Sequence, residues 1–312
     1  MCRTSPSRHL GLAFSLILPL AMVCAASAQT DAIPSDMTLR SDVTEVRMTF
    51  STTDQNGRVM ATVLPSDFAI VDGDMVVRDF RSFARSAYTR LEVAVLVDAS
   101  ESITAQLRQE LANVVQLIGE TSGVPDESFS VVSFRDLKPA VVCESNCRAL
   151  NTSAQFPVIP SGGLTPLYDS VVFAARKLGY DNDPHVRRIL ILFSDGADTI
   201  SLKSFTDAMN SALDNDVAIY SVDVSRQPHS SPGTLVLRSF SVNTGGRYFP
   251  VEAGTTKLID AVLEDFHAAY TVAYKLPSHA DGFHLVRILP THDLSLQFHC
   301  RRGYYYPSSP EN

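Results

Sequence analysis

The sequence predicts an α/β domain with a doubly wound, mostly parallel, Rossmann-like sheet that is inserted in or flanked by a small β domain. Between residues 89 and 268, short apolar runs alternate with segments whose apolar residues recur at helical spacing. Apolar strands that alternate with helices are typical of a parallel sheet covered on both faces. Before and after this zone, apolar and polar residues alternate in short stretches separated by Asn-Gly or Asp-Gly pairs, which indicates antiparallel hairpins.

The first zone, residues 37–88, is predicted to form β-strands. Apolar and polar side chains alternate from Val46 to Phe50, and the pair Asn56-Gly57 follows as a hairpin turn. A second hairpin is predicted where a short apolar run meets Asp72-Gly73.

The middle zone contains the predicted α/β domain. Strands are expected at residues 91–97, 129–134, 189–193, 217–222 and 248–249. Helices are expected at residues 103–118, 166–178, 201–213, 232–244 and 254–268. Thr165 is expected to cap the second of these helices, with Pro166 in its first turn and Gly179 at its end.

The third zone, residues 269–310, is again predicted to be β. Strands are expected around residues 272–276, 283–289 and 294–300. Neither β zone alone is long enough for a stable core, so we expect residues 269–310 to pack with residues 37–88. The α/β domain would then be inserted into a β domain built from both ends of the chain.

Residues 1–28 are predicted to be a signal peptide rather than part of the fold. Arg3 and Arg8 precede an apolar stretch that ends in Ala26-Ser27-Ala28, a suitable cleavage site. We therefore expect a secreted, periplasmic or cell-envelope protein with no membrane span after cleavage, the alternative being an uncleaved anchor. The net charge of −8 becomes −10 when Arg3 and Arg8 leave, which argues against a general nucleic-acid or anionic-membrane binder.

Three cysteines remain after cleavage. Cys143 and Cys147 are expected in a polar loop, and a small local disulfide is the favoured interpretation for an exported protein. A zinc site is disfavoured because no second Cys or His pair stands at ligand spacing. Cys300 is expected to be a buried, unpaired thiol, although sequence alone does not fix the connectivity.

Oxygen-bearing side chains gather where predicted strands end or helices begin. Asp98, Ser100 and Ser102 follow an apolar strand, Thr165 precedes a helix, and Asp195 follows the apolar run 189–193. In open α/β sheets, ligands bind beyond the carboxyl ends of the strands. Carboxylates and small hydroxyls suit a hard divalent cation such as Mg²⁺, with Mn²⁺ or Ca²⁺ as alternatives. Protein groups would fill only part of its coordination shell, so that a water molecule or a partner's carboxylate completes it.

This arrangement resembles the metal-ion-dependent adhesion site of von Willebrand factor A domains. That pattern is Asp-x-Ser-x-Ser, then a Thr on a later loop, then an Asp in a Ser/Thr-Asp-Gly context, and this chain matches it without departure. The flanking segments 64–68 and 301–305 are similar to those of a secreted bacterial family related to von Willebrand factor A. The resemblance implies an ion that bridges to an exposed Asp or Glu of a protein partner. In some relatives the last helix, here 254–268, shifts when the ion gains that ligand.

The function that we expect is therefore an exported, metal-dependent adhesion or interaction module rather than an enzyme. The alternative is a scaffold or assembly protein with a structural metal site, and a metal-dependent hydrolase is the weakest candidate. Phosphotransferases that use an aspartyl nucleophile carry Asp-x-Asp, whereas position 100 here is Ser. The sequence also contains no Gly-x-Ser-x-Gly elbow, no phosphate-binding glycine loop and no His-Glu-x-x-His motif.

Overall fold

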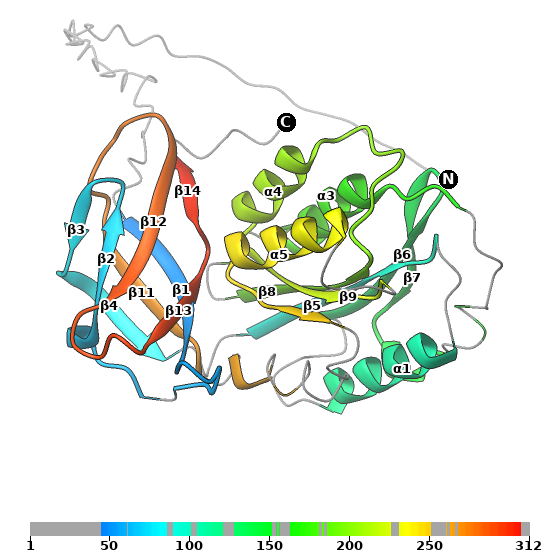
Figure 1. Cartoon of the computed structure of the whole chain (residues 1–312), viewed down its shortest axis with the longest axis horizontal. Coiled ribbons are helices and arrows are strands. Elements are labelled where there is room, and N and C mark those ends of the chain that lie inside the picture. Colours follow the sequence, from blue (N-terminus) through cyan, green and yellow to red (C-terminus); the bar gives the residue numbers. More distant parts are fainter. Residues whose placement is uncertain are drawn as a thin grey trace, which may run out of the picture. The chain divides into compact units, whose positions relative to one another are not determined.

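The protein is described here from a computed structural model (Figure 1). The described residues are 45–60, 62–85, 90–100, 105–120, 128–151, 154, 156, 163–180, 183, 186–225, 231–250, 260, 263–265 and 268–306. The predicted signal peptide, Ser102 and most of the predicted helix 254–268 lie outside these ranges. No helix within them is long and apolar enough to span a membrane.

A central, mostly parallel sheet confirms the predicted α/β class. From edge to edge, its six strands are β10 (Tyr248–Pro250), β9 (Val217–Asp223), β8 (Val186–Ser194), β5 (Arg90–Asp98), β6 (Phe129–Arg135) and β7 (Lys138–Glu144). All neighbouring pairs are parallel except β6 and β7, which form an antiparallel hairpin at one edge. Every residue of β8 is buried, as expected for a strand covered on both faces.

Helices cover both faces of this sheet (Figure 1). They are α1 (Ala105–Glu120) on one face, and α3 (Leu167–Leu178), α4 (Phe205–Asp214) and α5 (Pro232–Thr244) on the other. Alternate side chains of β5 enter the two cores: Val95 packs with α1, whereas Leu96 packs with α3. The short helix η3 (Cys147–Ala149) follows β7, and a disulfide joins Cys143 to Cys147, as the sequence predicts.

Strands from the two ends of the chain form a pair of antiparallel, four-stranded sheets. One contains, in order, β13 (Gln297–Cys300), β1 (Glu45–Thr53), β11 (Tyr270–Lys275) and β4 (Phe80–Arg85). The other contains β14 (Gly303–Tyr306), β12 (Gly282–Pro290), β2 (Phe68–Asp72) and β3 (Met75–Val77), with helix η1 (Pro65–Asp67) before β2. Buried residues of both sheets share one apolar core, so the sheets form a sandwich. The domain boundaries at residues 88 and 268 remain predictions.

Three local differences from the sequence-based expectations have physical causes. Strand β7 was not expected, because its edge position leaves it a mixed pattern that includes Pro139. Helix α4 begins at Phe205 rather than near 201, since Ser204 and Asp207 form a capping box there. The expected cap at Thr165 is wrong: Pro166 occupies the cap position of α3, and the Thr165 hydroxyl bonds elsewhere.

Candidate metal centre

The candidate metal centre lies at the carboxyl ends of two neighbouring parallel strands. Asp98 is the last residue of β5, and Ser194 is the last residue of β8, whose pairing with β5 is in register up to Val97 and Phe193. Thr165 reaches the same edge from the loop before α3. The structure thus brings together predicted site residues that are distant in sequence.

A continuous chain of hydrogen bonds joins the side-chain oxygens. Thr165 Oγ1 donates to Ser100 Oγ at 2.8 Å, and Ser100 Oγ donates to Asp98 Oδ1. The Ser100 amide also donates to Oδ1, at 3.0 Å, and Ser194 Oγ donates to Asp98 Oδ2 at 2.8 Å. Asp98, Ser100, Thr165 and Ser194 are all buried. The arrangement therefore holds one carboxylate among three hydroxyl groups.

Asp195 lies beside this chain, on the turn that follows β8. Its Oδ1 accepts a hydrogen bond from the Ala197 amide at 2.8 Å, and its side chain is only partly buried. The turn continues through Gly196, which adopts a φ of +79°. Gly233 in the first turn of α5 packs so closely that a methyl group on either glycine would overlap the other segment's backbone.

Two hydrogen bonds fix the Thr165 loop to the loop that contains Asp195. The Thr165 amide donates to Thr199 Oγ1 at 2.7 Å, and the Thr199 amide donates to the Thr165 carbonyl at 2.9 Å. Asp198 accepts hydrogen bonds from the Tyr168 amide and from Ser201, so it anchors α3 rather than joining the oxygen chain.

The Asp98 carboxylate is in an unfavourable environment for a negative charge. Burial, helped by the nearby charge of Asp195, raises the pKa of Asp98 to about 6, although the hydrogen bonds from Ser100 and Ser194 act in the opposite direction. Within the described residues no salt bridge reaches Asp98. A buried carboxylate without a cationic neighbour is electrostatically incomplete, and a cation would complete it.

The donor set fits a hard divalent cation. Carboxylate and hydroxyl oxygens are the ligands that Mg²⁺, Mn²⁺ and Ca²⁺ prefer. The described residues contain no group of three or more His, Cys, Asp or Glu that could hold a metal ion, so an ion at this site would depend on the hydroxyl oxygens as well. Asp98, Ser100 and Thr165 already lie in one bonded group, with Asp195 close enough to act on the Asp98 charge. The fifth predicted ligand, Ser102, lies outside the described residues.

Sequence reasoning missed two residues that position this site. Ser194 holds the second oxygen of Asp98, and Thr199 holds the Thr165 loop. Ser194 stood in the predicted Ser-Asp-Gly motif, but the motif alone does not show which neighbour its hydroxyl contacts. Thr199 carries no local pattern, since its role arises from a contact 34 residues away.

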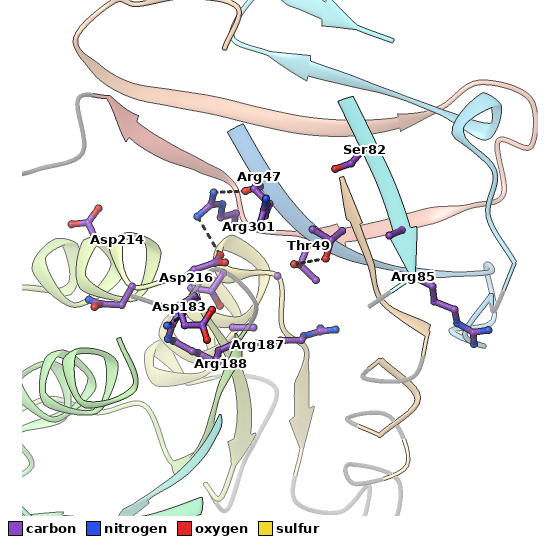
Figure 2. A pocket seen from close by; sticks show the side chains of 17 residues that line it. Arg47, Thr49, Ser82, Arg85, Asp183, Arg187, Arg188, Asp214, Asp216 and Arg301 are labelled. Atoms are coloured by element: carbon purple, nitrogen blue, oxygen red, sulfur yellow. Dashed lines mark hydrogen bonds and ion pairs between the residues drawn. The ribbon is translucent and has the colours of Figure 1, made fainter. Parts of the chain in front are cut away.

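A cleft of about 490 Å³ lies at the opposite end of the sheet, where the sandwich meets the α/β region (Figure 2). Arg301 spans it, donating to the Arg47 carbonyl at 2.8 Å and pairing with Asp216 at 3.2 Å. Arg188 donates to the Leu178 carbonyl at 2.7 Å. These guanidinium groups join segments of the protein to one another, and we assign the cleft no ligand.

Comparisons with known proteins find solved structures of partial similarity at low identity. No protein-family model matches the sequence, and no curated protein sequence matches it. Similar solved structures include an aerotolerance-related membrane protein from Bacteroides fragilis, at 13% identity and TM-score 0.42, with 56% of this chain and 98% of that chain covered. Proximal thread matrix protein 1 from the mussel byssus shows 19% identity and TM-score 0.42, and the match covers 62% of this chain and 50% of that chain. The manganese-loaded TRAP protein of Plasmodium vivax shows 12% identity and TM-score 0.42, and the match covers 75% of this chain and 97% of that chain.

Proposed function

We propose that this protein is an exported, non-enzymatic interaction module that binds a protein partner through a divalent cation. Asp98, Ser100, Ser102, Thr165 and Asp195 would hold the ion, which is Mg²⁺ or, alternatively, Mn²⁺ or Ca²⁺. An exposed Asp or Glu of the partner would complete its coordination.

The observation that carries this proposal is the buried Asp98 carboxylate, bonded to hydroxyl groups and to no cation. The other buried aspartates of the described chain contact tyrosine or arginine side chains. Asp223, at the end of the adjacent strand β9, accepts from Thr234 and Tyr248 at 2.7 and 2.8 Å. Among the described aspartates, Asp98 combines burial, hydroxyl neighbours and a nearby second carboxylate at the ligand-binding edge of the sheet.

The residues of this chain would act by binding and orienting rather than by proton transfer. Ser100 and Thr165 present oxygens on short side chains, and Ser194 holds the Asp98 carboxylate in one orientation. A bound ion would supply positive charge at the rim of the sheet, where a partner's carboxylate can reach it.

The test is calorimetric titration of Mg²⁺ and Mn²⁺ into the mature protein and its Asp98→Ala variant. We expect one ion per chain for the wild type and no measurable binding for the variant. Asp72→Asn is the matched control, because it alters another buried aspartate, in strand β2 of the sandwich, and should leave ion binding unchanged. Loss of binding in Asp72→Asn as well, or its persistence in Asp98→Ala, would contradict the proposed site.

Capture of a partner with and without chelator separates this function from the alternative of a permanent scaffold. A partner released by chelator, and not captured by Asp98→Ala, is expected for a metal-bridged contact. A partner retained in chelator would favour an assembly protein whose metal site is structural.

A further inference from the structure

A second surface feature adjoins the candidate metal centre but uses none of its ligands. A groove of about 580 Å³ lies between the outer face of α3, strand β7 and the loop before α4. Its volume is in the range of pockets that bind ligands. Asp169 forms part of its wall and receives the Leu202 and Lys203 amides at 3.0 and 2.8 Å, which fixes the loop against α3.

The groove is lined by apolar side chains that nothing in the described chain covers. Val141 is 42% exposed, Phe173 is 37% exposed and Leu202 is 94% exposed. Single exposed apolar residues are ordinary on protein surfaces, but here residues from three separate elements converge on one depression. This convergence is typical of a contact surface rather than of scattered surface residues.

Cations surround this apolar floor. Arg176, Lys177 and Lys203 line the groove, against the single carboxylate of Asp169. Lys177 pairs with Glu144 of β7, and both oxygens of Asp169 already accept backbone amides. Within the described residues, Arg176 and Lys203 form no salt bridge, although the charge of Lys203 acts on the exposed carboxylate of Asp207 outside the groove. The residues that line the groove therefore carry more positive than negative charge, on a chain whose net charge is −8.

We propose that this groove binds an acidic, apolar peptide segment of a protein partner. An apolar side chain of the segment would occupy the depression formed by Val141, Phe173 and Leu202. Flanking Asp or Glu residues would pair with Arg176 and Lys203. Burial of the apolar side chain provides affinity, and the two cations select the sign of the partner's charge.

This inference goes beyond the metal-bridged contact and does not depend on it. The groove begins one helical turn after the Thr165 loop, so one partner can contact both surfaces, but peptide binding in the groove requires no ion. Its test is therefore carried out in chelator, where the candidate metal centre contributes nothing.

The experiment is a selection of displayed random peptides on the immobilised mature protein in the presence of EDTA. Counter-selection uses the double variant Arg176→Glu/Lys203→Glu. We expect the enriched peptides to carry a large apolar residue flanked by Asp or Glu. Fluorescence anisotropy with one such peptide should show binding weakened by about tenfold or more in the double variant and in Leu202→Ser.

Two matched variants serve as controls. Arg58→Glu/Arg78→Glu makes the same change of net charge on exposed residues of the sandwich and should leave peptide binding unchanged. Asp98→Ala should also leave it unchanged, so failure of the metal site and failure of the groove are distinguishable. No enrichment, enrichment of basic peptides, or equal binding to the groove variants would each overturn the proposal.

Discussion

At the scale of single residues, the four buried aspartates of the described chain differ in their partners. Asp72 accepts hydrogen bonds from Tyr274 and Tyr304 on one oxygen, and its other oxygen has no hydrogen-bond partner among the described residues. Asp223 accepts from Tyr248, and Asp265 pairs with Arg247. Asp98 accepts from two serine hydroxyls and one amide, and burial raises its pKa. Its negative charge is therefore disfavoured, which is suitable for a cation site and unfavourable for stability.

Asp98→Asn is expected to stabilise the metal-free protein while removing ion binding. Folding raises the pKa of Asp98 from its ordinary value of 3.8 to about 6. The protonated carboxyl group therefore contributes fully to the free energy of unfolding below the unfolded-state pKa, and this contribution is lost as the pH rises through about 6. The loss amounts to about 2–3 kcal/mol at neutral pH. Asparagine avoids this loss. Denaturant unfolding with EDTA at pH 4 and pH 7 checks it.

The gain in Asp98→Asn should be present at pH 7 and absent at pH 4, where the wild-type carboxyl group is largely protonated. Asp223→Asn should instead destabilise the protein at both values, since it disturbs a satisfied carboxylate. Equal effects of the two substitutions would contradict the distinction between Asp98 and its satisfied counterparts.

At the scale of elements, the first turn of α5 positions the Asp195 turn. Gly233→Ala would place a methyl group against the Asp195 carbonyl and displace the turn. We expect the affinity for Mg²⁺ or Mn²⁺ to fall by about tenfold, with a destabilisation of about 1–3 kcal/mol from overpacking. Calorimetric titration and denaturant unfolding measure the two effects.

Leu235→Ala is the control on the same helix, because Leu235 is exposed and remote from this close contact. It should leave ion affinity unchanged. A Gly233→Ala protein that binds the ion with wild-type affinity would show that α5 does not position Asp195.

The success of sequence-based prediction also varied by element, for identifiable reasons. Strands β5 and β8 and helix α5 were predictable because their apolar patterns are uniform or their ends carry caps such as Ser231. Strand β7 was missed because an edge strand with Pro139 carries no such pattern. The role of Thr165 depends on Ser100, 65 residues away, so local rules wrongly assigned its hydroxyl to a helix cap.

At the scale of the whole molecule, the α/β region occupies the connection between two paired strands. Arg85, the last residue of β4, is the register partner of Tyr270, the first residue of β11. Contacts between the sandwich and the α/β region include polar hydrogen bonds. The Arg302 amide donates to the Asn243 carbonyl at 2.7 Å, and the Tyr305 hydroxyl donates to Asn210 Oδ1 at 3.0 Å. Polar interfaces of this kind are typical of domains that retain their own cores.

We therefore expect a protein in which residues 45–85 continue through a short turn into residues 270–306 to fold as a sandwich. The sheets and their shared core would remain, because every strand pair of the sandwich lies within these two segments. Circular dichroism and the dispersion of amide NMR signals would show this. Residues 90–268 alone should unfold cooperatively. Failure of both proteins to fold would contradict the predicted division into domains.

The pairing of Arg85 with Tyr270 also determines how the protein would respond to mechanical force. A partner held at the carboxyl edge of the central sheet would pull on the sandwich through both connections at once, at the same end of β4 and β11. In a protein held at Glu45, the start of β1, that load acts in shear on the ladder between β11 and β1, which runs from Glu45–Lys275 to Phe50–Tyr270. Its hydrogen bonds would then share the tension rather than break one after another.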